Sequence, residues 1–193
     1  MDNILDLLNG SLGKEVVDGI TQKTDASAEE TQAVVSTALP ALMGALQNNA
    51  TSGDGAQGIL NAIGSKHDGS ILDNLSGFLG NDDTSDGNGI LGHVLGNKRG
   101  AVEQAISGKT GVSSGTVSKI MAMLAPIVMG YLGKQSRNNN VSDGGGLSDM
   151  LGGMLGGQSG GGNVLGGLLD QNGDGKLGVD DVGGLLGGFF GKK

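Results

Sequence analysis

Residues 170–181 carry the most specific chemical pattern in the chain, because oxygen-bearing side chains recur there at alternate positions. Asp170, Asn172 and Asp174 occupy positions 1, 3 and 5 of this 12-residue stretch, where a calcium-binding loop places its side-chain ligands. Gly175 follows at position 6, where the chain must turn sharply around the ion. The pattern predicts a site for a hard divalent cation, and Ca²⁺ is the expected ligand.

The second half of the stretch completes the ligand set with one departure from the usual pattern. Lys176 at position 7 would contribute only its backbone carbonyl, and Gly178 at position 9 leaves that place to water. Position 12 is Asp181, one methylene shorter than the usual bidentate Glu, while Asp180 would add charge without coordinating. The stretch resembles the EF-hand-like loops of dockerin-type repeats, in which Asp at position 12 is normal. We expect weak binding, with a Kd on the order of 10⁻⁵–10⁻³ M.

A second segment, 66–73, looks like a version of the same loop that has lost its ligands. Asp68 and Gly69 match positions 5 and 6, but positions 1 and 3 are Gly64 and Lys66, which offer no side-chain oxygen. We interpret this segment as a turn that caps a helix over 70–79. The alternative for 170–181 itself is a solvated linker, rich in Asx turns, that binds no metal.

Catalytic chemistry has little support in the sequence. Residues 108–110 lack the upstream glycine and the preceding strand of a P-loop, and 157–161 spell a nucleophile elbow inside a glycine tract. His67 and His93 are the only imidazoles, and we expect both on helix surfaces. We therefore predict a non-enzymatic protein with no catalytic residues. An enzyme would need a cleft that places one of these histidines beside carboxylates.

Composition limits the partners and the fold. The 193 residues include 41 glycines, 4 aromatic residues and no cysteine, so the core must use aliphatic side chains and no thiolate or disulfide chemistry is available. The net charge of −8 disfavours nucleic acid and anionic membranes as partners. We see neither a signal peptide nor an apolar run of about 20 residues, so a cytoplasmic protein is the default, with unconventional export left open.

An internal repeat organises the first two thirds of the chain. A shift of 86 residues aligns 4–46 with 90–132 without a gap and gives 12 identities in 43 positions. Each copy reads as a short helix, a medium helix and a long helix. The aliphatic residues available for the core pack helices against helices more readily than they build sheets, so we predict an all-α fold in which two similar substructures pack in one body.

The two long helices of the repeat are predicted in most detail. Ser27 and Glu30 form a capping box at the start of the first long helix, over 27–47. Pro40 and Pro126 lie at matching positions of the two copies, and each removes one helical hydrogen bond. We expect a kink or a break at both prolines.

A shift in composition divides the chain into three parts. Residues 1–135 form the predicted helical body, and 136–146 form a polar linker rich in Gly and Asn. Residues 147–193 form a Gly-rich tail of short helices that carries the calcium loop at 170–181. Between 143 and 193, 20 of 51 residues are glycine, so these helices need contact with the body or bound metal to be stable.

Several segments in order resemble one bacterial family. They are 37–46 (TALPALMGAL), 67–73 (HDGSILD), 89–96 (GILGHVLG) and 124–130 (LAPIVMG). Over about 1–135 the chain is similar to the bacterial YidB-like group, domain-of-unknown-function family 937. The resemblance implies an all-α bacterial domain without an assigned activity and without catalytic residues to carry over.

Two functions remain open from the sequence. The first is a non-enzymatic helical protein whose single weak calcium loop orders the C-terminal tail. The second is a structural or protein-interaction module whose tail is only a tether and binds no metal. In the second case a protein partner, or self-association, would involve the helical body.

Overall fold

The computed structural model describes residues 10–155, and this part of the chain is helical, with turns and no strand. The all-α prediction is therefore confirmed for these residues. The helices are α2 (Ser11–Thr21), α3 (Ala28–Ala50), α4 (Gly53–Ser65), the 3₁₀ helix η1 (Ser70–Asn74), α5 (Leu75–Gly80), α6 (Ser85–Leu95), the 3₁₀ helix η2 (Gly96–Lys98), α7 (Arg99–Thr110), α8 (Ser114–Asn138) and α9 (Gly144–Met154).

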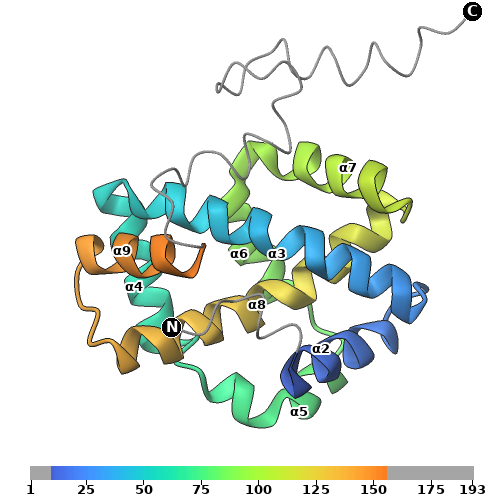
Figure 1. Cartoon of the computed structure of the whole chain (residues 1–193), viewed down its shortest axis with the longest axis horizontal. Coiled ribbons are helices and arrows are strands. Elements are labelled where there is room, and N and C mark those ends of the chain that lie inside the picture. Colours follow the sequence, from blue (N-terminus) through green and yellow to red (C-terminus); the bar gives the residue numbers. More distant parts are fainter. Residues whose placement is uncertain (1–9, 156–193) are drawn as a thin grey trace, which may run out of the picture.

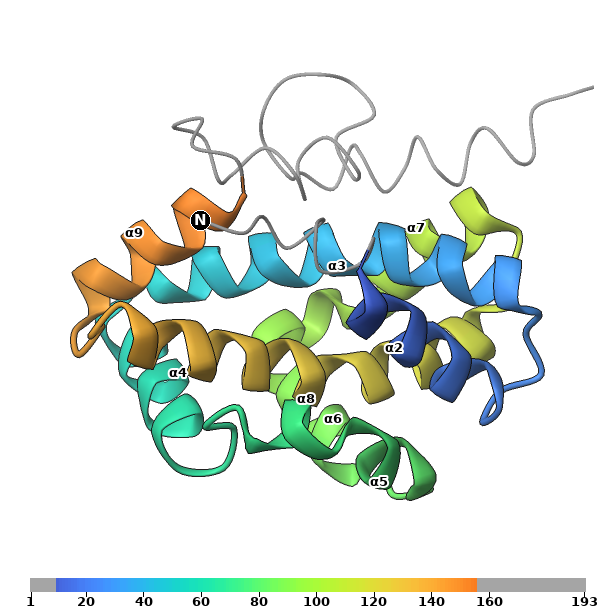
Figure 2. The same cartoon turned by 60° about the horizontal axis from the view of Figure 1, so that its bottom comes forward.

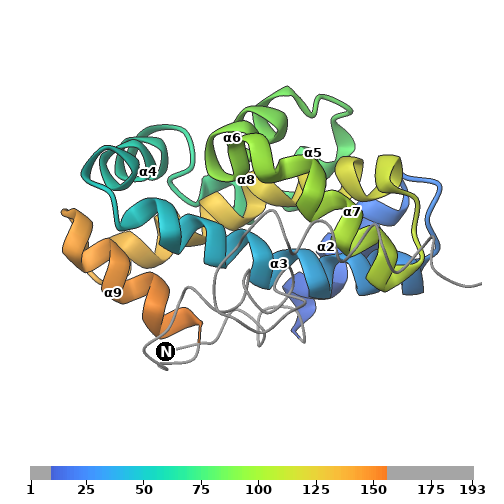
Figure 3. The ribbon, with the colours of Figure 1, turned by 90° about the horizontal axis from the view of Figure 1, so that it is seen from above.

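The two longest helices, α3 and α8, form the centre of the body (Figure 1). Figure 2 shows α3 above α8, with α4, α5 and α6 below α8. In the view from above, α4, α5 and α6 lie on one side of α3, and α9 and α2 lie on the other side (Figure 3). Of the described helix pairs, α6 and α8 pack most extensively against each other. The aliphatic side chains of all these helices contribute to one hydrophobic cluster.

The start of α3 follows from its predicted capping box. The backbone N–H of Glu30 donates to Ser27 Oγ at 3.2 Å, and the Ser27 N–H donates to Glu30 Oε2 at 2.8 Å. These two bonds satisfy amides that the first helical turn leaves free. Pro40 and Pro126 both lie inside their helices, so the expected break does not occur at either proline. Packing on several sides of α3 and α8 compensates for the hydrogen bond that each proline removes.

Helix α8 is apolar along most of its length because it is the core helix of the body. It is the one helix among residues 10–155 that is long and apolar enough to cross a membrane, and 78% of its most apolar window is buried inside the body. That burial is typical of a central helix.

Helix α9 shows how a glycine-rich segment is held as a helix. Asp143 Oδ1 accepts from the Gly146 N–H at 2.9 Å and so caps its first turn. Leu147, Leu151 and Met154 are buried where α9 packs against α3 and α4. Their burial offsets the low helix propensity of the glycines between them. Residues 139–143 form the connection between α8 and α9.

Candidate functional site

The predicted calcium loop lies outside the described residues. Nothing in the structure therefore bears on Asp170, Asn172, Asp174, Lys176 and Asp181 as ligands. Within residues 10–155, no group of three or more His, Asp and Glu side chains comes together in a way that could hold a metal ion.

The turn between α4 and η1 is docked directly onto α8. Gly69 has a φ of 100°, a left-handed conformation that suits glycine and reverses the chain after His67. On α8, a Cβ at Gly133 would collide with the carbonyl oxygen of His67, and a Cβ at Gly130 would collide with the Ile71 side chain. Gly130 and Gly133 have no Cβ, so the segment from His67 to Ile71 can approach the backbone of α8 closely at these two positions.

The Asp68 carboxylate makes two further contacts that stabilise the same turn. The Ser70 N–H donates to Asp68 Oδ1 at 3.0 Å, which forms an Asx turn at the start of η1. Arg137 Nη1 of α8 lies 3.3 Å from Asp68 Oδ2. The hydrogen bonds from Ser70 and, to a smaller extent, the Arg137 guanidinium lower the pKa of Asp68. The predicted helix over 70–79 is thus the 3₁₀ helix η1 followed by α5, and the Asx turn of Asp68 precedes it.

His67 is buried beside a carboxylate of α6. Its side chain is 7% exposed, and its Nε2 lies 3.5 Å from Asp86 Oδ2. Lys66 Nζ lies 4.0 Å from the other oxygen of Asp86. Burial lowers the pKa of His67 below its usual 6.5, and Lys66 adds to this effect, while the Asp86 charge opposes it. His67 is consequently a neutral imidazole at pH 7.

The expectation of a surface histidine is wrong for His67 and confirmed for His93, which is exposed on α6. The error has a physical cause, because His67 follows the end of α4 and enters the core with the turn that docks on α8. Nothing in the local pattern of residues 66–69 indicates burial. Gly130 and Gly133, spaced by three on a long helix, are the signal that could have indicated a close contact at this place.

An open hollow of about 700 Å³ lies next to this pair. His67, Asp86, Asp83, Ser85 and Phe78 are among its lining residues. A histidine beside a carboxylate is the arrangement on which general-base chemistry depends, so the structure does bring one of the two histidines into a hollow lined by carboxylates. The imidazole is almost fully covered, however, and Asp86, with a side chain 42% exposed, occupies the approach to its Nε2. The geometry therefore suits a contact that joins α6 to the docked turn better than it suits a general base that contacts a substrate.

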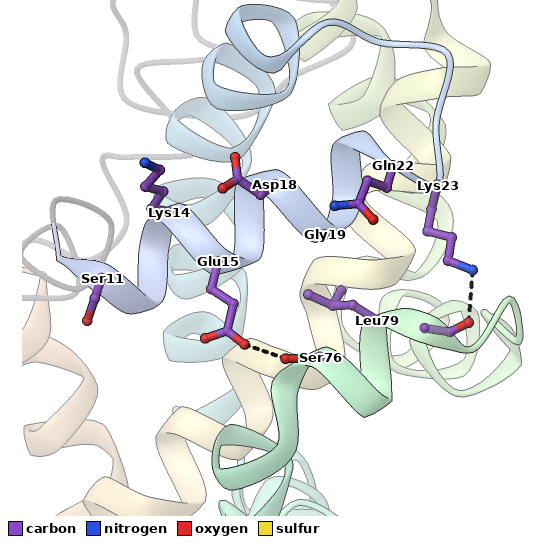
Figure 4. Close-up of a pocket in the computed structure, with 10 residues that line it drawn as sticks. Ser11, Lys14, Glu15, Asp18, Gly19, Gln22, Lys23, Ser76 and Leu79 are labelled. Carbon is purple, nitrogen blue, oxygen red and sulfur yellow. Dashed lines mark hydrogen bonds between the residues drawn. The ribbon is translucent and has the colours of Figure 1, made fainter.

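A smaller hollow of about 410 Å³ lies between α2 and α5 (Figure 4). Ser76 Oγ donates to Glu15 Oε1 at 2.8 Å, and Lys23 Nζ donates at 2.8 Å both to the Gly80 carbonyl and to Asp82 Oδ1. The Lys23 ammonium lowers the pKa of Asp82. These contacts join α2 to α5, and they engage Glu15 and Lys23, two of the charged residues that line the hollow.

A family model matches most of the described body. It carries the description "Bacterial protein of unknown function (DUF937)" and covers residues 6–135. The chain belongs to the DUF937 family. Nothing matches among curated proteins or among solved structures. The DUF937 match includes the docked turn, His67, Asp86 and both central helices, and it ends before α9 and before the predicted calcium loop.

Proposed function

We propose that this chain is a non-enzymatic protein in which the DUF937 body carries a single calcium-binding loop at 170–181. The observation behind the proposal is the ligand spacing, with side-chain oxygens at positions 1, 3, 5 and 12 and glycine at position 6. Asp170, Asn172, Asp174 and Asp181 would ligate Ca²⁺ through their side chains, and Lys176 through its carbonyl. A loop gathers these ligands only when it closes, so metal binding would order the tail.

Helix α9 supports the second half of this proposal. It has a Leu/Met-Gly-Gly composition, and it is held as a helix because its leucines and methionines are buried against α3 and α4. The segments on either side of the loop, 164–169 and 182–190, have the same composition. We propose that closure of the loop around Ca²⁺ brings these two segments together, so that they bury their apolar side chains as α9 does.

Isothermal titration of the full chain with Ca²⁺ tests the metal site. Asp170→Ala removes a predicted ligand at position 1, whereas Asp180→Ala removes the same charge from position 11 of the same loop. We expect saturable heat from the unmodified chain and from Asp180→Ala, with a Kd on the order of 10⁻⁵–10⁻³ M, and loss of that heat in Asp170→Ala. Equal heats from the two variants, or none from the unmodified chain, would contradict the proposal.

The alternative is that the body binds a protein partner, or a second copy, and the tail is a tether without metal. One observation favours it: the family match ends at residue 135, so the body is a unit that the family model describes without the loop. Hydrogen exchange of the tail with and without a chelator distinguishes the two proposals. An unchanged exchange pattern supports the tether, and faster exchange of 164–190 after chelation supports the calcium clasp. The cytoplasmic location stays a prediction in both cases.

A further inference from the structure

Helix α9 is anchored in the body by one apolar face. Leu147, Met150, Leu151 and Met154 are spaced as i, i+3, i+4 and i+7, and each is at most 5% exposed. This is the spacing with which an amphipathic helix fills a groove on another protein. The helix packs mainly against α3 and α4, at the end of the body where these two helices meet (Figure 3). Helices α3 and α4 therefore form a groove that accepts a helix with four apolar anchors.

Helix α9 is held in this groove only weakly. Five of its 11 residues are glycine, and glycine lowers helix stability relative to alanine at each such position. The segment therefore has little tendency to be helical before it docks. Residues 139–143 connect it to α8, and four of these five residues are exposed. The family match ends at residue 135, so it includes α3 and α4 and excludes α9.

The groove contains a polar group that α9 leaves without a partner. Gln47 of α3 faces α9, since a Cβ at Gly152 would lie 3.3 Å from the Gln47 Nε2. The Gln47 Oε1 is buried and has no hydrogen-bond partner among residues 10–155. An unsatisfied buried acceptor is destabilising, so glycine at this position of α9 makes its fit to the groove poorer. A helix with a hydroxyl group at this position would satisfy the Gln47 amide.

We propose that the α3–α4 groove is the docking site for a helix of a protein partner, and that α9 is its displaceable occupant within the chain. The partner helix carries Leu or Met at the four anchor positions and a hydrogen-bonding side chain where α9 has Gly152. It has better helix formers than glycine at its other positions, so it pays less to become helical and displaces α9. The site belongs to the body, so it does not depend on Ca²⁺ binding by residues 170–181.

A synthetic peptide based on residues 143–155 is the probe for the partner helix. Alanine replaces Gly145, Gly146 and Gly153, which raises helix propensity without changing the four anchors. The nearest neighbours of a Cβ at the first two positions belong to the connection before α9, and the third position is exposed. The serine peptide also carries Gly152→Ser, and the alanine peptide, its matched control, carries Gly152→Ala.

Two cysteines placed across the groove control whether α9 can leave it. The chain has no cysteine, and a Cβ at Gly144 of α9 would lie 3.0 Å from the Ala56 Cβ of α4. In the full chain with Ala56→Cys and Gly144→Cys, oxidation should therefore form a disulfide that holds α9 in place, and reduction should release it. With fluorescently labelled serine peptide, we expect saturable binding to the reduced chain in fluorescence polarisation. Binding to the oxidised chain should be at least tenfold weaker.

Two further measurements connect binding to Gln47 and to the displacement of α9. Gln47→Met, added to the reduced chain, removes the amide and keeps a side chain of similar length. The preference for the serine peptide over the alanine peptide should be about fivefold greater with Gln47 than with Gln47→Met. In the unmodified chain, the serine peptide should accelerate hydrogen exchange of residues 147–154 and leave that of α8 unchanged. This last comparison does not depend on any variant folding.

Four results would overturn the proposal. The first is no binding to the reduced chain, or equal binding to the reduced and oxidised chains. The second is unchanged hydrogen exchange of residues 147–154 in the presence of the serine peptide. The third is the same preference for the serine peptide with and without the Gln47 amide. The fourth is a dimer of the reduced chain that oxidation abolishes, because the occupant would then be α9 of a second copy.

Discussion

Replacing Gly87 with alanine tests whether α6 is seated on α8 by direct backbone contact. Gly87 is buried in the first turn of α6, and a Cβ there would collide with the carbonyl oxygen of Ala122. That carbonyl belongs to the backbone of a buried helix, so it cannot rotate away as the end of a flexible side chain would. The substitution should therefore push α6 away from α8 as a unit.

The expected loss of stability is a difference between opposing effects. Alanine improves helix propensity over glycine by about 1 kcal/mol. Overpacking costs about 1–3 kcal/mol, and displacement of α6 also exposes part of Leu91 and Leu95, whose full burial is worth about 1.5–3 kcal/mol each. If about half of that burial is lost, the free energy of unfolding falls by about 1.5–5 kcal/mol. Total stabilities of domains are typically about 5–15 kcal/mol, so the effect is large.

Urea denaturation followed by circular dichroism at 222 nm measures this change, because the described body is helical. Gly92→Ala on the same helix is the matched control, since Gly92 is exposed and a Cβ there would meet nothing within 4 Å. We expect the control to raise the free energy of unfolding by about 1 kcal/mol. If Gly87→Ala were as stable as wild type, or were stabilised like the control, the close approach of α6 and α8 would be refuted.

Two other substitutions test buried polar groups. Thr31 is fully buried, and its hydroxyl has no hydrogen-bond partner among residues 10–155. Val117 occupies the matching position of α8, so Thr31→Val should raise the free energy of unfolding, measured in urea, by about 1 kcal/mol. Thr110→Val is the control and should lower the free energy of unfolding, because the Thr110 hydroxyl donates to the Ile106 carbonyl at 2.8 Å. If Thr31→Val also lowered the free energy of unfolding, the Thr31 hydroxyl would not be an unsatisfied buried group. Because the pKa of His67 is lowered in the folded state, the unfolded state binds more protons as the pH falls through 6.5, and stability should drop there. The check is the urea midpoint measured between pH 7.5 and pH 5. We expect the midpoint to depend less on pH in His67→Gln than in wild type, and to depend on pH as in wild type in His93→Gln. An unchanged pH dependence in His67→Gln would show that His67 is not the source of the drop in stability.

Local features of the helices could be predicted because their causes lie within a few residues of sequence. The capping box of Ser27 and Glu30 requires only a spacing of three, and the structure shows both of its hydrogen bonds. The long helix predicted at the end of each copy is likewise present, as α3 and α8. Pro40 and Pro126 predicted a kink or a break, and both helices continue through these residues without a break. The sequence shows the hydrogen bond that each proline removes, but the packing that keeps each helix continuous comes from residues far away in the chain.

The docked turn could not be predicted, because its cause lies in contacts between distant segments. His67 is buried by α8, and its carboxylate partner Asp86 comes from α6, 19 residues further along the chain. Periodicity indicates which face of a helix is buried without indicating which turn rests on it. Glycine is frequent in this chain, so only the spacing of three from Gly130 distinguishes Gly133, which permits the contact, from Gly92, where an added Cβ would meet nothing within 4 Å.

Glycine permits close helix packing in this protein, whereas in a linker it supplies flexibility. With 4 aromatic residues in the chain, the core is built from aliphatic side chains, and close approach of the helices compensates for their smaller size. Gly87, Gly130 and Gly133 permit that approach in the body, and in α9 the burial of leucine and methionine holds a glycine-rich helix in place. A high glycine content in 156–193 is therefore no argument that this part must act as a tether. If the loop closes around Ca²⁺, the apolar residues on both sides of it have the same means of stabilisation as α9, and the metal has to supply only the energy that brings them together.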